Sequence, residues 1–265
     1  MRILAIAAFF ALLGCTSEAE PKLPLVQPTS FDGAQASSSK ASVVHGERLS
    51  RVLGCRGCHG DELEGKRFYE LYASNLTRDV VGYSDAQLKR LLRQGIHPTG
   101  RDVWGMPSEL FQHLSLADEA ALIDYLRTLS PAGQPTQSRL PWSPEAAKMI
   151  ADGKIKPAAA TARETEDIAP VDLGPQYALG RYISRVTCAE CHGPKLEGGD
   201  TPNLTVVSAY TREEFDKLIT QGIPTNNRKL HWLMVDVAKG RFSHLTKYER
   251  DELYAYLMAR AKQPT

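Results

Sequence analysis

The apolar residues divide the chain into stretches of different character. Met1 and Arg2 are followed by an unbroken run of eleven apolar or small residues, from Ile3 to Leu13. Such a run is too short to span a bilayer, but it suits the hydrophobic region of an export signal. The pattern therefore predicts a signal peptide at residues 1–14 and a chain that leaves the cytoplasm.

A cysteine stands directly after the apolar run. Leu12-Leu13-Gly14-Cys15 resembles the lipobox of bacterial lipoproteins, in which the signal is cut before the cysteine and the new N-terminal residue is acylated. The resemblance implies a lipid anchor on Cys15, and Thr16 in place of an acid would permit outer-membrane sorting in Gram-negative bacteria. The alternative is a plain secretory signal followed by an incidental thiol.

Polar residues dominate the next stretch, 15–41, which is rich in Ser, Pro, Ala and acids. Without an apolar period it cannot bury enough surface to offset the entropy lost on ordering. We expect a flexible tether here, which would let a folded body move clear of a membrane surface.

Beyond residue 41, apolar positions recur at spacings of three and four, which predicts short helices. Several helix starts show an N-cap Ser or Thr with an acid or amide three residues later, a spacing that satisfies free backbone amides. The pairs are Ser84 with Gln87, Thr211 with Glu214, Thr246 with Glu249 and, more loosely, Ser115 with Asp118. No convincing alternating strand is present, so an all-α fold is expected.

An internal repeat organises these helices. Residues 55–65 recur as 188–198, with seven of eleven positions identical. Shorter matches follow in the same order on both sides, so the repeat predicts two tandem copies of one domain, at 42–130 and 176–265. Between them, residues 131–175 carry seven of the chain's 16 prolines, which predicts a linker lying along both domains, with Trp142 as a candidate anchor.

Each repeat carries a C-x-x-C-H motif. The motif residues are Cys55, Cys58 and His59 in the first copy and Cys188, Cys191 and His192 in the second. Two thiols three positions apart on one turn can add across the vinyl groups of a haem, while the adjacent histidine turns its imidazole to the iron. A thioredoxin-like dithiol would require a βαβ context, and a zinc site would leave the histidines and the repeat unexplained. The motifs therefore predict two covalently bound haem c groups.

These motifs and the repeat resemble the diheme members of the class I cytochrome c family. The resemblance covers residues 42–130 and 176–265 and implies a three-helix haem wrap in each half, joined by a Pro- and Ala-rich linker. In that family a glycine on the first helix lets the last helix cross closely. The pairs that would fill this role are Gly46 with Tyr125 and Gly180 with Tyr256.

The resemblance also implies a methionine as the sixth iron ligand, which raises the potential and closes the iron to small molecules. Met106, in a Met-Pro turn, is expected at the first haem. Met234 holds the matching place in the second copy, but a valine replaces the proline, and the stretch from Met234 to His244 is three residues longer than that from Met106 to His113. His231 and His244 are therefore alternatives at the second iron. A scheme with His113 and His244 as ligands stays open, although their place before the last helix favours a structural role.

Charge and composition do not by themselves indicate a function, so the function must come from the motif sites. The formal net charge of +1 supplies no field that argues for nucleic acid, and no set of catalytic acid, base and nucleophile is evident. We expect a periplasmic, lipid-tethered, non-enzymatic diheme cytochrome c that passes single electrons from a dehydrogenase or quinol-oxidising complex to an oxidase or soluble cytochrome. The alternatives are a diheme peroxidase-like enzyme with one open haem, and the cytochrome subunit of a dehydrogenase complex.

Overall fold

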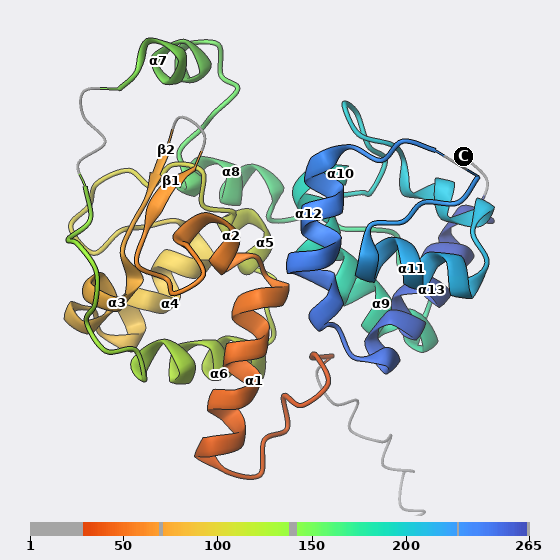
Figure 1. The fold of residues 1–265 in the computed structure, drawn as a ribbon, viewed down its shortest axis with the longest axis horizontal. Coiled ribbons are helices and arrows are strands. Elements are labelled where there is room, and N and C mark those ends of the chain that lie inside the picture. Colours follow the sequence, from red (N-terminus) through yellow and green to blue (C-terminus); the bar gives the residue numbers. More distant parts are fainter. Residues whose placement is uncertain (1–28, 69–70, 138–141, 227, 264–265) are drawn as a thin grey trace, which may run out of the picture.

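Each half of the chain is built on a pair of crossing helices. The computed structural model describes residues 29–68, 71–137, 142–226 and 228–263. In the first half α1 (Ser39–Val52) packs across α6 (Leu116–Arg127), and in the second α9 (Ala178–Ile183) packs across α13 (Lys247–Ala261). Figure 1 shows the two pairs in separate halves of the molecule, which is mostly helical, as expected.

Glycine lets the helices of each pair approach closely. A Cβ on Gly46 would lie 1.9 Å from a backbone oxygen of α6, and one on Gly180 would lie 2.1 Å from a backbone oxygen of α13. The Cβ atoms of Tyr125 and Tyr256 lie against the same positions. The pairing of each glycine with its tyrosine, expected from the family resemblance, is therefore present in both crossings.

Gly46→Ala is expected to lower the free energy of unfolding by about 1–3 kcal/mol or more, because an added methyl group overlaps backbone atoms that cannot move without separating the helices. Denaturant unfolding of the purified protein measures the effect. Gly82→Ala is the matched control in the same half, since a Cβ there would meet nothing within 4 Å. Equal losses in the two variants would contradict the close-crossing role.

Shorter helices connect each crossing pair. In the first half these are α2 (Cys55–His59), α3 (Leu76–Asp79), η1 (Val80–Gly82), α4 (Asp85–Gln94) and α5 (Ser108–Phe111). In the second half η2 (Pro175–Tyr177) precedes α9, and the connecting helices are η3 (Ser184–Cys188), α10 (Ala189–His192), η4 (Leu204–Ala209), α11 (Arg212–Gln221), α12 (Trp232–Gly240) and η5 (Phe242–His244). Within the described residues, no helix combines the length and apolar character needed to cross a membrane.

The structure also contains a short antiparallel strand pair that was not predicted. Strands β1 (Lys66–Phe68) and β2 (Leu71–Ala73) pair with Lys66 opposite Ala73 and Phe68 opposite Leu71. Three residues are too few for an alternating pattern to stand out in a sequence, which is why the pair was missed.

The linker between the halves contains helices α7 (Pro144–Ala151) and α8 (Ala158–Thr165). Helix α8 packs against α4 and α5 of the first half, and the ring of Trp142 meets that of Trp104 edge-on, with centroids 5.7 Å apart. Toward the second half, the hydroxyl of Tyr256 donates to the backbone oxygen of Val171 at 2.9 Å. The linker therefore contacts both halves, and Trp142 anchors it to the first.

The segment before α1 is packed on the body of the protein rather than extended from it. The side chain of Phe31 is only 2% exposed, and its backbone N–H donates to Asp118 at 3.0 Å. The N–H of Asp32 donates to Glu249 at 2.9 Å. Asp118 and Glu249 occupy the same position, three residues after the N-cap, in the last helix of each half. The segment thus binds both halves.

The predicted tether at 15–41 is therefore wrong for residues 29–41. Its composition concealed one buried aromatic side chain, Phe31, whose ring also packs on Tyr182 with centroids 5.4 Å apart. Helix α1 likewise begins at Ser39, ahead of the expected domain start at residue 42. The predicted signal peptide, Cys15 and the rest of the tether lie outside the described residues.

Candidate functional site

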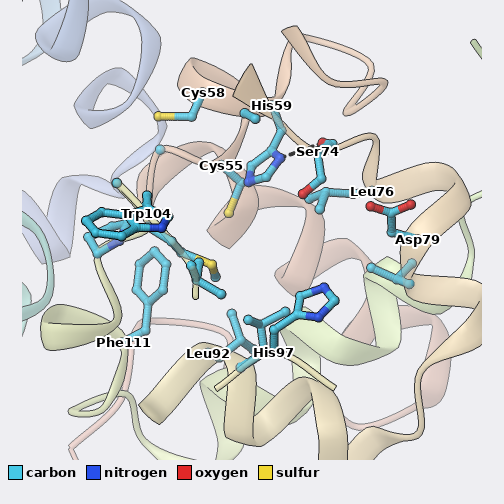
Figure 2. Close-up of a pocket in the computed structure, with 18 of the residues that line it drawn as sticks. Cys55, Cys58, His59, Ser74, Leu76, Asp79, Leu92, His97, Trp104 and Phe111 are labelled. Carbon is cyan, nitrogen blue, oxygen red and sulfur yellow. Dashed lines mark hydrogen bonds between the residues drawn. The ribbon is translucent and has the colours of Figure 1, made fainter. Parts of the chain in front are cut away.

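The first C-x-x-C-H motif lies on the wall of a large cavity. The cavity holds about 1180 Å³ of free space, part of it open to solvent, and is lined by Cys55, Cys58 and His59 together with Met106. Figure 2 shows Cys55 and His59 entering it from the side opposite Leu92 and His97. The structure thus brings Met106, about fifty residues along the chain, to the same cavity as the motif.

The remaining walls of this cavity are mostly apolar. They include Leu53, Phe68, Leu88, Val103, Phe111 and Leu122. The polar lining includes Tyr83, His97 and Arg101, and the hydroxyl of Tyr83 lies 3.0 Å from Nε2 of His97. Burial raises the pKa of Tyr83, so this hydroxyl keeps its proton at neutral pH. An apolar slot with thiols and an imidazole on one wall and a thioether on its lining fits a haem c group.

The two motif histidines are oriented in the same way. Nδ1 of His59 lies 2.7 Å from the backbone oxygen of Ser74, and Nδ1 of His192 lies 2.7 Å from that of Pro202. A carbonyl oxygen only accepts, so Nδ1 carries the hydrogen in each ring and Nε2 carries the lone pair that can bind a metal. Burial also lowers the pKa of His192, which favours the neutral imidazole that a metal requires.

A repeated backbone feature follows each motif. Leu63 and Leu196 have φ angles of 60° and 62°, in the left-handed region that leucine rarely adopts. Each donates its N–H to the glycine that follows the motif histidine, and each side chain is fully buried. Packing therefore holds a strained turn beside the site. The sequence offered one signal for it, because this leucine is among the positions identical in the two repeats.

The cysteines lack the chemistry of a reactive dithiol. The four described thiols are free, and burial raises the pKa of Cys55, Cys58 and Cys188 to about 11. A redox-active C-x-x-C pair needs a thiol with a lowered pKa, because the thiolate is the nucleophile. Among the described residues, no three His, Cys, Asp or Glu side chains are grouped so that they could hold a metal ion, so the zinc arrangement weighed above is not formed there.

The expected ligand of the second half lies in a different setting from Met106. Met234 is in the first turn of α12, whereas Met106 precedes α5 in a loop. Both side chains pack against the core. The longer stretch after Met234 is thus folded as a helix. His231 is the N-cap of α12, and its Nδ1 accepts from the N–H of Leu233 at 3.3 Å.

The matched histidines before the last helices lie at other sites. His113 lines a separate small cavity with Glu109 and Arg185, where burial lowers the pKa of its imidazole to about 4. His244 ends η5, and its backbone oxygen accepts from Arg48 at 3.2 Å. A structural role for the pair stays a prediction.

The two motifs approach each other across the boundary between the halves. Glu190, from within the second motif, lines the cavity of the first. Nη1 of Arg241 donates to Glu190 at 2.6 Å, and the charge of this guanidinium opposes the rise in pKa at all four motif thiols. The sequence analysis did not identify Glu190 or Arg241 as residues near both motifs. The only sequence signal for Arg241 was that the stretch from Met234 to His244 is longer than its counterpart in the first half.

Residues 175–257 match the family model described as cytochrome c oxidase, cbb3-type, subunit III. The matched region covers well under half of the chain and includes the second C-x-x-C-H motif and Met234. It supports a c-type cytochrome domain in this part of the chain, and such a domain implies covalently bound haem c and electron transfer. No curated protein matches the chain.

Proposed function

We propose that the chain is a periplasmic diheme cytochrome c, held at a membrane through lipidated Cys15, that transfers single electrons between respiratory or dehydrogenase partners. The observation that carries the proposal is the first cavity, in which Cys55, Cys58, His59 and Met106 meet within apolar walls. The same motif recurs in the half that matches a cytochrome family. The proposal of two sites rests on this repeat.

Each residue has a defined role in the proposed first site. Cys55 and Cys58 would hold the haem through thioether bonds, and Nε2 of His59 and the sulfur of Met106 would serve as ligands of its iron. When bound, haem c supplies one-electron chemistry at its iron. The backbone oxygen of Ser74 fixes the His59 ring, and the apolar walls exclude water. Cys188, Cys191, His192 and Met234 are proposed for the corresponding roles in the second site.

The proposed partners are redox proteins. A dehydrogenase or quinol-oxidising complex would supply electrons, and an oxidase or soluble cytochrome would accept them. The family named in the comparison contains an oxidase subunit, which supports an oxidase on the accepting side. A lipid on Cys15 would raise the local concentration near membrane-bound partners, since tethering makes the second encounter effectively intramolecular.

A redox titration tests the proposal on full-length protein expressed with a cytochrome c maturation system. We expect two haems per chain, both low-spin, two electrons taken up per chain, and full reoxidation by an oxidised soluble c-type cytochrome. No haem, or reduction without reoxidation, would overturn the proposal. A stable complex with a dehydrogenase in membrane extracts would instead identify a subunit of that complex.

The peroxidase-like alternative retains one supporting observation, the helical setting of Met234 in place of a Met-Pro loop. An enzyme of this kind keeps one sixth position open or displaceable for substrate. Peroxide consumption by the half-reduced protein, together with a high-spin signal from one haem, would favour this alternative. If the half-reduced protein consumes no peroxide and neither haem gives a high-spin signal, the electron carrier is favoured.

A further inference from the structure

Arg241 lies in the part of the second half that the repeat does not explain. The stretch from Met234 to His244 is three residues longer than that from Met106 to His113. The structure folds this stretch as α12 and η5, and Arg241 joins the two. In Figure 1, α12 lies on the side of the second half that faces the first. The extension therefore places a side chain at the boundary between the halves.

The guanidinium of Arg241 contacts both motif regions. Its Nε donates to the backbone oxygen of Val52 at 3.1 Å, three residues before Cys55, and its Nη1 donates to Glu190 at 2.6 Å, inside the second motif. It also lies directly against Gly54, where an added Cβ would be 2.8 Å from Cζ of Arg241. One side chain thus joins the segment entering the first motif to the middle of the second.

The Arg241 guanidinium is buried more deeply than the Glu190 carboxylate with which it pairs. Its side chain is 12% exposed, whereas that of Glu190 is 31% exposed. Nη2 is buried and has no hydrogen-bond partner among the described residues. Solvent screens the more exposed carboxylate better, so the cation dominates the field inside the boundary.

We propose that Arg241 is a positioning residue that holds the two C-x-x-C-H segments together and stabilises the reduced state of both haems. The inference rests on the proposed diheme function. Each haem loses one positive charge when it accepts an electron, so a nearby buried cation favours the ferrous form. Glu190 has the opposite effect on both sites. One guanidinium therefore makes the two potentials depend on the same charge.

The test is spectroelectrochemical titration of the full-length protein loaded with haem, with haem content measured first. Arg241→Gln is expected to lower both potentials, so that the ferrous-to-ferric ratio at the wild-type midpoint falls about tenfold at each haem. Arg241→Lys, which keeps the charge, is expected to recover most of that loss. Glu190→Gln is expected to raise both potentials. If Arg241 and Glu190 had only structural roles, the shift in potential would not change sign between Arg241→Gln and Glu190→Gln.

Lys239→Gln is the matched control, because it removes one positive charge from the exposed surface of the same helix. Equal shifts in Arg241→Gln and Lys239→Gln, or a shift at one haem only, would overturn the inference. If Arg241→Gln fails to take up both haems, the potentials of Glu190→Gln and Arg241→Lys still test the inference. Unchanged potentials in Glu190→Gln would then overturn it. Wild-type protein with fewer than two haems would instead contradict the proposed function.

Discussion

Cys55→Ala/Cys58→Ala protein is expected to carry one covalent haem per chain in place of two. The thioether bonds at the first site need both thiols, and these lie on the cavity wall beside His59. The cavity would then be left with its apolar walls unfilled, and about 3–5 kcal/mol of stability is commonly lost when a large buried group is removed. Mass spectrometry of the intact protein and the haem absorbance per chain measure the change.

Cys188→Ala/Cys191→Ala is the matched variant at the second site and is expected to retain the first haem. The variant with all four changes is expected to hold no covalent haem. Two haems remaining in either double variant would contradict the assignment of one haem to each motif. Loss of both haems from both variants would show that the two halves do not take up haem independently.

Met106→Ala is expected to convert the first haem from low-spin to high-spin and to lower its potential. Met106 lines the same cavity as His59 in the first half, and alanine has no sulfur to bind the iron. The sulfur-to-ferric-iron absorption band should fall from two-haem to one-haem strength. Carbon monoxide should bind the reduced variant at the vacated position. Visible spectra of the oxidised and reduced protein measure these changes.

Met149→Ala is the control for this experiment, because Met149 lies in linker helix α7 and is not a ligand candidate. It should leave the band and the spin state unchanged. An unchanged band in Met106→Ala would mean that another side chain binds the first iron, and His97, which lines the same cavity, would be the next candidate. The corresponding Met234→Ala variant decides between the second-site methionine and His231 or His244.

Local patterns in the sequence were reliable where the interaction is also local. The capping boxes predicted at Ser84, Thr211 and Thr246 are all formed with the residue three positions later. Each depends only on neighbouring backbone and side-chain atoms. One half of the looser pair is also formed, because the side chain of Ser115 accepts from the backbone N–H of Asp118.

Asp118 shows why the rest of that pattern failed. Its carboxylate accepts from the side-chain hydroxyl of Ser115 at 2.9 Å, but the backbone N–H of Ser115 donates to the hydroxyl of Tyr182 instead, so the capping box is not closed. The carboxylate also accepts from the N–H of Phe31, the hydroxyl of Tyr182 at 2.7 Å and Nε2 of His45 at 2.8 Å. These partners come from three separate segments of the chain. A buried carboxylate needs every available donor, and which donors reach it depends on how the segments pack.

The sequence by itself determined the repeat, the two C-x-x-C-H motifs and the capped helix starts, because each is encoded in short spacings. The close helix crossings at Gly46 and Gly180 were expected only from the family resemblance. Tertiary structure alone decided which methionine shares a cavity with a motif, where Phe31 is buried, and that Arg241 reaches Val52, 189 residues away. These features depend on contacts between distant residues, and a contact of that kind forms only once packing has placed both partners.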